Sequence, residues 1–265
     1  MSRALPIEPW VRDMETKIRI ENLSVRYSDG TESLRAITMD IYAQQINVLF
    51  GPAGGGKSTL LRTLNRLNDL ADVVAQSGHV TLDGEDIMAP GYDVIRLRRR
   101  VGIVFARPVP LPMTIYQNIT YGLELAGVRE RPLLDAAVER CLKQAALWDE
   151  VGMRLHEPAH ALSGGQQQRL CLARTLALQP EVILLDEPTS GLDPISTGKV
   201  EQTLQELKAS YTIVIVPHSV QQAARVADWA TFFLQGELVE SGPRDQIFTN
   251  PQDRRTDEYI TGRFG

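Results

Sequence analysis

The chain has no long apolar runs, only two cysteines and no excess of positive charge. The longest apolar stretches, such as Val182–Leu185 and Ile213–Val216, fall well short of the ~20 apolar residues that a membrane-spanning helix needs. Cys141 and Cys171 are far apart and form no C-x-x-C pair, so we expect two small hydrophobic residues and no disulfide framework. The net charge of −5, from 28 Lys and Arg against 33 Asp and Glu, disfavours bulk nucleic-acid binding.

The composition is that of an ordinary globular protein. Hydrophobic residues make up 43% and charged residues 23% of the 265 positions, which excludes a disordered or collagen-like chain. The first 17 residues lack the apolar core of about 7 to 15 residues found in a secretory signal. We therefore expect residues 1–16 to form a short N-terminal tail.

The N-terminal part of the chain has the pattern of antiparallel strands. Ile18, Ile20, Leu23 and Val25 nearly alternate with polar residues, as in a half-buried strand. A turn signal at residues 28–30 then leads into a second strand, which we expect over 34–41.

Further along the chain, short and almost uniformly apolar segments alternate with helical periodicity. These strand candidates cover residues 46–50, 101–105, 182–185 and 212–216, and the first leads through glycines into a predicted helix over 59–67. Uniformly apolar strands separated by helices indicate a parallel sheet that is covered on both faces, and thus an α/β fold.

Between residues 107 and 163 the pattern changes. Prolines at 108, 110 and 112 interrupt regular structure, and residues 115–126 and 132–148 show helical periodicity. We interpret this region as a helical insertion in the α/β core. The expected division is a tail over 1–16, a discontinuous core over 17–106 and 164–250, a helical subdomain over 107–163, and a C-terminal tail over 251–265.

The strongest motif is a glycine-rich loop that follows the strand at 46–50. Residues Gly51–Ser58 read GPAGGGKS and fit the pattern G-x-x-x-x-G-K-[ST], between a predicted strand and a predicted helix. Glycines let the backbone wrap round phosphates, and the start of the helix favours negative charge. Lys57 would neutralise the β- and γ-oxygens, while the hydroxyl of Ser58 would bind Mg²⁺. The predicted ATP-binding residues of this segment are Gly51, Pro52, Ala53, Gly54, Gly55, Gly56, Lys57, Ser58 and Thr59.

Two carboxylates end the strand at 182–185. At the carboxyl edge of a parallel sheet, Asp186 can reach a Mg²⁺ ion that accompanies a nucleotide on the loop after another strand. Glu187 is placed to orient or deprotonate an attacking water. A solvated loop start is the alternative for this pair on its own, but the phosphate loop favours the catalytic interpretation.

A second anion-binding helix start precedes this strand. Ser163, Gly164, Gly165 and Gln166 follow Leu162 and open a helical stretch. Two phosphate-seeking ends in one chain suggest that the second serves a nucleotide held by another copy. The alternative is an ordinary helix start that is capped by Ser163.

With the motif LSGGQ between a phosphate loop and an Asp-Glu strand, the chain resembles the ATP-binding subunits of ABC transporters over nearly its whole length. The resemblance implies a P-loop NTPase fold of the ABC ATPase type: a RecA-like parallel-sheet core, an N-terminal antiparallel β subdomain and an inserted α-helical subdomain. It also implies a head-to-tail homodimer that encloses two ATP molecules, with Ser163–Gln166 completing the partner's site. By the same resemblance, Ser190, Gly191, Leu192 and Asp193 form the loop at the dimer seam, His218 contacts the γ-phosphate, and Tyr27 stacks on adenine. One tyrosine near a turn is otherwise more often part of the core or the surface.

Within the family, the chain is similar to the ATPase subunits of bacterial high-affinity phosphate importers. This similarity is carried by the segments 81–86, 97–105, 107–116 and 258–265. It implies two transmembrane permease subunits, a solute-binding protein outside the membrane, and a peripheral position on the cytoplasmic face. The alternatives are an importer for another solute, such as an amino acid, and a soluble ABC ATPase that acts on DNA or ribosomes.

Two positions depart from the family pattern. Ala106 stands where the family has a glutamine whose amide contacts Mg²⁺ or the attacking water, and a methyl group can do neither. This suggests weakened hydrolysis or coupling with ATP binding retained, and hence a hydrolysis-impaired or regulatory ATPase as an alternative. Pro217, before His218, replaces a Thr or Asp and either stiffens that segment or ends the strand.

The one dense basic cluster comprises Arg96, Arg98, Arg99 and Arg100. It lacks the interleaved aromatic residues of a nucleic-acid site. We expect a solvated helix end, or a contact with anionic lipid or a membrane partner.

The motifs and the resemblance together predict Lys57, Glu187 and His218 as catalytic residues, with Ser58 and Asp186 as metal ligands and ATP and Mg²⁺ as cofactors.

Overall fold

The computed structural model describes residues 14–263 of the chain. Its first layer is an antiparallel sheet with the strand order β2-β1-β4-β5. The strands are β1 (Thr16–Tyr27), β2 (Glu32–Tyr42), β4 (Val73–Leu82) and β5 (Glu85–Asp86). Alternate residues of β1, among them Ile18, Ile20, Leu23 and Val25, are fully buried, which confirms the half-buried pattern. Most of the expected tail 1–16 lies outside the described residues, and Thr16 begins β1.

The second sheet has the order β10-β9-β3-β8-β7-β6. Its parallel strands are β6 (Val101–Val104), β7 (Val182–Asp186), β8 (Thr212–Val216), β3 (Ile46–Phe50) and β9 (Trp229–Leu234), and β10 (Glu237–Pro243) pairs antiparallel at the edge. Every residue of β3 and β8 is buried, because helices and the first sheet cover both faces. The predicted α/β fold is therefore confirmed.

Two apolar clusters hold these layers together. One packs the antiparallel sheet and Leu60, Leu61 and Leu64 of α1 (Lys57–Leu64) against one face of the second sheet. The other packs its opposite face against α6 (Gly164–Ala177), α7 (Pro194–Leu207) and α8 (Val220–Val226). Helix α1 begins two residues earlier than predicted and ends at Leu64, because Arg66 adopts a left-handed conformation with φ of 58°. The short helices η2 (Leu67–Leu70) and α2 (Val94–Arg100) complete this part.

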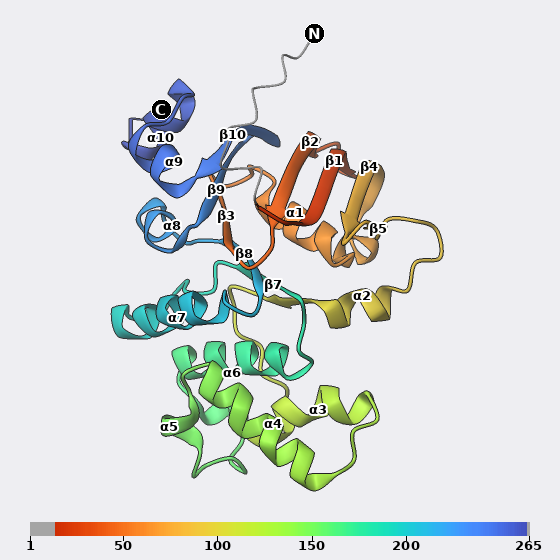
Figure 1. Cartoon of the computed structure of the whole chain (residues 1–265), viewed down its shortest axis with the longest axis vertical. Helices are drawn as coiled ribbons and strands as arrows, with labels where there is room; N and C mark the ends of the chain where they lie inside the picture. Colours follow the sequence, from red (N-terminus) through yellow and green to blue (C-terminus); the bar gives the residue numbers. More distant parts are fainter. Residues whose placement is uncertain (1–13, 264–265) are drawn as a thin grey trace.

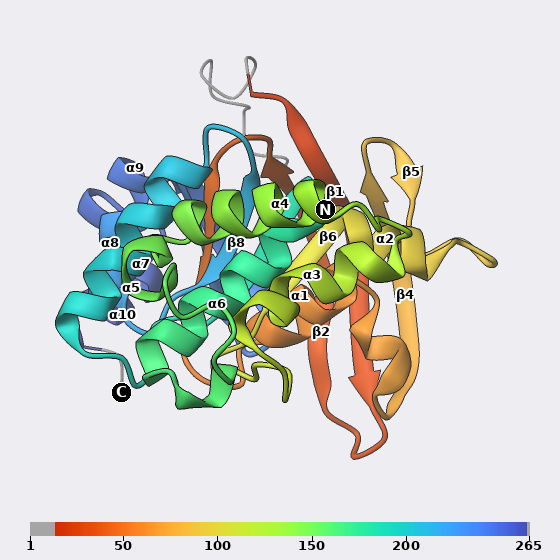
Figure 2. The same cartoon turned by 90° about the horizontal axis from the view of Figure 1, so that it is seen from below.

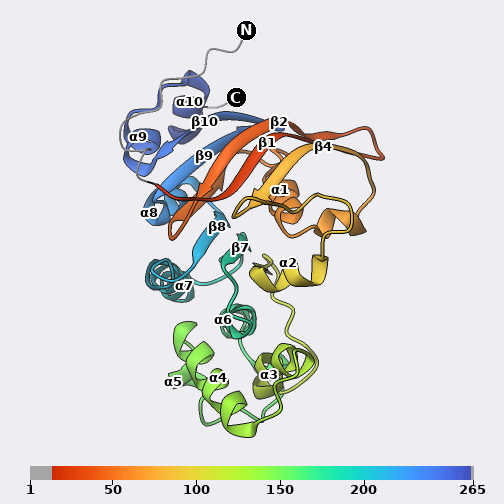
Figure 3. The same cartoon turned by 45° about the vertical axis from the view of Figure 1, so that its right-hand side comes forward.

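The region after β6 forms a helical layer at the end of the molecule away from the antiparallel sheet (Figures 1 and 3). Its helices are α3 (Ile115–Leu125), α4 (Arg131–Gln144), α5 (Trp148–Val151) and η3 (Ala159–Ala161). Helices α3 and α4 both pack on α6, as Figure 2 shows from below. The helix predicted over 132–148 is broken between α4 and α5, because Ala146 has φ of 49°. The domain boundaries at 106/107 and 163/164 remain predictions.

The C-terminal segment is more ordered than the expected tail over 251–265. After α9 (Arg244–Thr249), helix α10 (Arg254–Ile260) packs on the second sheet. The ring of Tyr259 stacks on Phe232 with centroids 5.0 Å apart, and Thr256 is fully buried. The sequence prediction missed this helix because its buried partners lie in distant strands. Between residues 14 and 263, no helix is long and apolar enough to cross a bilayer.

Candidate functional site

The phosphate loop runs from the end of β3 to the start of α1, and two of its glycines are sterically required. Gly51 has φ of 140°, and a Cβ there would lie 2.0 Å from the carbonyl oxygen of Phe233. Gly56 has φ of 94°, and its Cβ would lie 2.3 Å from the carbonyl oxygen of Ser33. The loop is therefore held between β9 and β2 in a conformation that only glycine adopts at these positions.

Lys57 folds back over this loop. Its Nζ donates to the carbonyl oxygens of Gly51 and Pro52 at 2.8 and 2.7 Å. Burial lowers the pKa of Lys57, and the nearby carboxylates of Glu187 and Asp186 partly oppose that shift. Phosphate oxygens bind an ammonium group more strongly than neutral carbonyls do, so a nucleotide can take over this cation. The loop encloses a hollow of about 260 Å³ lined by Ser33, Ala53, Gly54, Gly55, Gly56, Lys57, Ser58, Thr59 and Glu187.

The two predicted metal ligands meet although 128 residues separate them. The hydroxyl of Ser58, in the first turn of α1, donates to Asp186 Oδ1 at 3.0 Å. A hydroxyl and a carboxylate are hard oxygen donors, and Mg²⁺ is usually held by one or two such groups together with phosphate oxygens and water. Within residues 14–263 no group of three His, Cys, Asp or Glu side chains could hold a metal alone. The pair therefore fits Mg²⁺ that arrives with a nucleotide.

Glu187 and His218 lie together at the open side of the loop. Glu187 has φ of 47°, and its backbone N–H donates to the carbonyl oxygen of Val216 at 2.8 Å. Its carboxylate Oε2 lies 3.9 Å from His218 Nδ1, and the side chains are 44% and 62% exposed. Both groups are thus accessible from outside, and Glu187 also lines the hollow at the phosphate loop.

The sequence model of the ABC transporter family matches residues 34–190, which span the loop, the LSGGQ segment and the strand-end carboxylates. This chain belongs to the ABC transporter family. The resemblance found in the sequence is thereby confirmed.

Known members of the family match nearly the full chain. The chain is 55% identical, over 96% of its length and 93% of the other protein, to the phosphate import ATP-binding protein PstB 2 of Aliivibrio fischeri. Among solved structures, cbiO1 of Clostridium perfringens, part of the ABC transporter complex cbiONQ, superposes with a TM-score of 0.78 at 27% identity, covering 94% of this chain and 97% of that one. The dimeric ATP-binding cassette MJ0796 bound to ADP and Pi gives 0.74 at 26% identity, covering 86% of this chain and 98% of that one.

Within this ABC protein, the LSGGQ segment forms a capped helix start. The Ser163 side chain accepts from the Gln166 backbone N–H at 3.3 Å, and the Gln166 side chain accepts from the Ser163 N–H at 3.0 Å. A Cβ on Gly165 would lie 2.6 Å from the hydroxyl oxygen of Ser196, so this helix start lies close to α7. Ser163 therefore caps the start of α6 in this single chain, as the alternative interpretation expected. The contact of this segment with a nucleotide on a second copy stays a prediction.

The predicted seam loop lies between β7 and α7. The carboxylate of Asp193 caps α7 by accepting from the backbone N–H groups of Ile195 and Ser196 at 2.9 and 3.0 Å. The N–H of Ser190 donates to the Glu187 carbonyl oxygen at 3.0 Å, which closes a turn directly after the predicted catalytic carboxylate. Gly191 and Leu192 complete this loop, whose place at a dimer seam stays a prediction.

Tyr27 ends β1 beside the first turn of α1. Its hydroxyl lies 3.1 Å from the hydroxyl of Thr59, which in turn lies 2.7 Å from that of Ser33. The ring also packs against the cluster between the sheets. Tyr27 is thus close to the loop and is partly a core residue, and its stacking on adenine stays a prediction.

Ala106 lies just after β6, next to α6. The buried side chain of Gln168 donates from Nε2 to the carbonyl oxygen of Phe105 at 3.0 Å, which ties this segment to the LSGGQ helix. Pro217 is buried directly after β8, which agrees with a proline that ends a strand.

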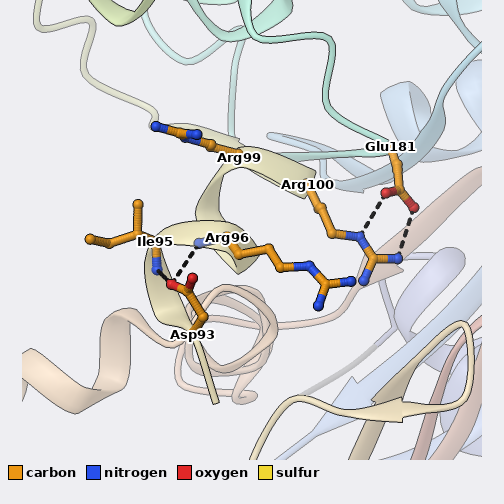
Figure 4. Close-up of a pocket in the computed structure, with 6 residues that line it drawn as sticks. All are labelled: Asp93, Ile95, Arg96, Arg99, Arg100 and Glu181. Carbon is orange, nitrogen blue, oxygen red and sulfur yellow. Dashed lines mark hydrogen bonds and ion pairs between the residues drawn. The ribbon is translucent and has the colours of Figure 1, made fainter. Parts of the chain in front are cut away.

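The arginine cluster is mainly structural. Arg100 pairs with Glu181 and Asp83, both at 2.6 Å between the nearest atoms, and Arg98 donates to two backbone carbonyls near the end of α1. A hollow of about 660 Å³ lies beside α2, away from the phosphate loop (Figure 4). Arg99 points away from Arg96 and Arg100 there.

Two polar networks near the site, one partly buried around Glu150 and one buried around Gln222, were not identified from the sequence. Glu150 accepts from Gln166, Arg169 and Lys199, which belong to α6 and α7. Gln222 connects the segments that carry Glu187 and His218. No local pattern marks either residue, because the partners lie elsewhere in the chain. Those of Glu150 are 16 to 49 residues away, and those of Gln222 are 4 to 33 residues away.

Proposed function

We propose that this chain is the ATP-hydrolysing subunit of an ABC importer for inorganic phosphate. The observation that supports ATP hydrolysis is the convergence of Lys57, the Ser58–Asp186 pair and Glu187 on one hollow. The phosphate cargo is supported by the 55% identity to a phosphate import ATP-binding protein. No residue of this site would contact the transported solute, which the membrane subunits and a binding protein handle.

The reaction is the attack of water on the γ-phosphorus of ATP, which breaks the bond to the β,γ-bridging oxygen and releases ADP and inorganic phosphate, with the charge stabilised by fixed groups. Lys57 and the loop amides hold the β- and γ-phosphates. Ser58 and Asp186 would hold Mg²⁺, which would neutralise charge on the phosphate oxygens. Glu187 orients the attacking water and accepts its proton, and His218 contacts the γ-phosphate.

The active form is a head-to-tail homodimer with two ATP molecules at its interface. Ser163–Gln166 of one copy complete the site that the loop of the other copy begins, and Ser190–Asp193 line the seam. The dimer works with two transmembrane permease subunits and, through them, with a solute-binding protein outside. It lies on the cytoplasmic face of the membrane as a peripheral subunit.

Glu187→Gln tests the proposed chemistry. The amide cannot accept the proton from water, so this variant is expected to bind ATP, stop turning over and accumulate as a dimer, which size-exclusion chromatography with ATP and Mg²⁺ measures. Rapid hydrolysis by the variant would place the base elsewhere.

A gene deletion tests the cargo. We expect the deletion to abolish phosphate uptake, and we expect the wild-type gene, but not Glu187→Gln, to restore it. Unchanged phosphate uptake with reduced uptake of an amino acid would support the alternative cargo.

A further inference from the structure

Gln222 lies in the first turn of α8 and is 2% exposed, and both polar atoms of its carboxamide are hydrogen-bonded. Its Oε1 accepts from the hydroxyl of Thr189 at 3.0 Å and from the backbone N–H of His218 at 3.0 Å. Its Nε2 donates to Glu201 Oε1 at 3.2 Å. A long polar side chain is thus held inside the protein by three partners from three segments.

The orientation of this amide follows from the chemistry of its partners. A backbone N–H only donates, so the group that faces His218 must be the oxygen. An ionised carboxylate only accepts, so the group that faces Glu201 must be the NH₂. A flipped amide would lose both bonds.

The two segments that Gln222 joins carry the predicted catalytic groups. Thr189 follows Glu187 by two residues, and its carbonyl oxygen accepts from the N–H of Leu192 in the seam loop. His218 follows β8, and its imidazole lies 3.9 Å from the Glu187 carboxylate. The β7–β8 pairing ties Glu187 to Val216, and beyond that pairing Gln222 is the side chain that joins the seam loop to the backbone of His218.

The far end of the carboxamide is itself fixed. Glu201 lies on α7, the helix that Asp193 caps, and Arg225 donates to both of its oxygens at 3.0 and 2.6 Å. Glu201 is therefore held between α7, which carries it, and two residues of α8, Gln222 and Arg225. One connected set of bonds runs from the seam loop through Gln222 to α7 and α8.

We propose that Gln222 is a positioning residue for ATP hydrolysis, which holds His218 and the segment Glu187–Asp193 in one arrangement. This inference rests on the proposed function of the chain. Removing the carboxamide leaves the buried Thr189 hydroxyl and the partly buried His218 N–H without their acceptor. The two groups can find new hydrogen-bond partners if their segments shift, and such a shift displaces Glu187 relative to His218. The phosphate loop and Lys57 have no bond to Gln222 and keep their positions.

The test compares Gln222→Met with Gln221→Met, the same substitution at the exposed neighbouring position. We expect Gln222→Met to lower the kcat for ATP hydrolysis by on the order of 10- to 100-fold, since small displacements of reacting groups have effects of this size. The KM for ATP and the number of ATP molecules bound per chain are expected to stay unchanged. Gln221→Met is expected to behave as the wild type. Equal kcat for both variants, or a parallel loss of ATP-binding sites in Gln222→Met, would overturn the inference.

An exchange variant separates positioning from a general effect on folding. Gln222→Glu alone places a second carboxylate beside Glu201 and is expected to lower kcat. Adding Glu201→Gln restores a donor opposite that carboxylate, so the double variant is expected to recover kcat to within a few-fold of the wild type. A double variant no better than Gln222→Glu would contradict the inference. A wild type without ATPase activity would refute the proposed function, whereas an active wild type with an equally active Gln222→Met would refute this inference alone.

Discussion

The Glu150 cluster, formed by Glu150, Gln166, Arg169 and Lys199, offers a quantitative test of how the LSGGQ helix is held. Glu150 lies on α5 and accepts from both Arg169 Nη atoms at 2.9 and 3.0 Å, from Gln166 at 3.0 Å and from Lys199. Hydrogen bonds from Arg169 are the main reason that the pKa of Glu150 is lowered from its ordinary value of 4.5 to about 2. One carboxylate thus joins the helical layer to α6 and α7.

We expect Glu150→Gln to lower the free energy of unfolding by about 2 kcal/mol at pH 7. The pKa difference corresponds to about 3 kcal/mol of favourable interaction, and the 27% exposure of the carboxylate reduces that value through solvent screening. The loss remains substantial because Arg169 is only 3% exposed and would keep a buried charge without its partner.

The effect has a defined pH window. The pKa of Glu150 is depressed in the folded state, so its contribution is complete above the unfolded value of about 4.5 and is lost as the pH falls toward 2. Urea denaturation of the wild type and the variant between pH 7 and pH 3 measures this convergence. Glu157→Gln is the matched control, because its pair with Arg154 is exposed on both sides and is expected to matter little. A stability difference that stays constant down to pH 3, or a control as destabilised as Glu150→Gln, would refute the reasoning.

Two further predictions concern the phosphate site. Gly51→Ala is expected to abolish ATP binding, measured by equilibrium binding, because its Cβ would lie 2.0 Å from the carbonyl oxygen of Phe233. The control Gly54→Ala is expected to bind ATP measurably, because a Cβ at Gly54 has nothing within 4 Å. Equal ATP binding by both variants would contradict the steric argument. Ala106→Gln is expected to raise ATPase activity by roughly tenfold, because it restores a side-chain amide near the attacking water. An unchanged rate and unchanged transport coupling would show that the alanine does not limit hydrolysis.

The main parts of the candidate site were predicted from the sequence alone. The phosphate loop, with Lys57 and Ser58, is contiguous, so its pattern is visible without a structure. Asp186 and Glu187 were found because the ends of parallel strands share one edge of a sheet, and Asp186 indeed meets Ser58. The strands were equally accessible, since alternation and uniform apolarity report burial on one face or on both.

Only the tertiary structure decided features that depend on contacts between distant segments. The break at Ala146 and the packing of Tyr259 on Phe232 have no local signature, so the first was predicted as continuous helix and the second as part of a tail. Glu150 and Gln222 look like ordinary polar residues of helical stretches, and only the fold brings them to their partners. A sequence pattern records which residues one element buries, whereas the pairing of buried polar groups depends on how the elements pack against each other.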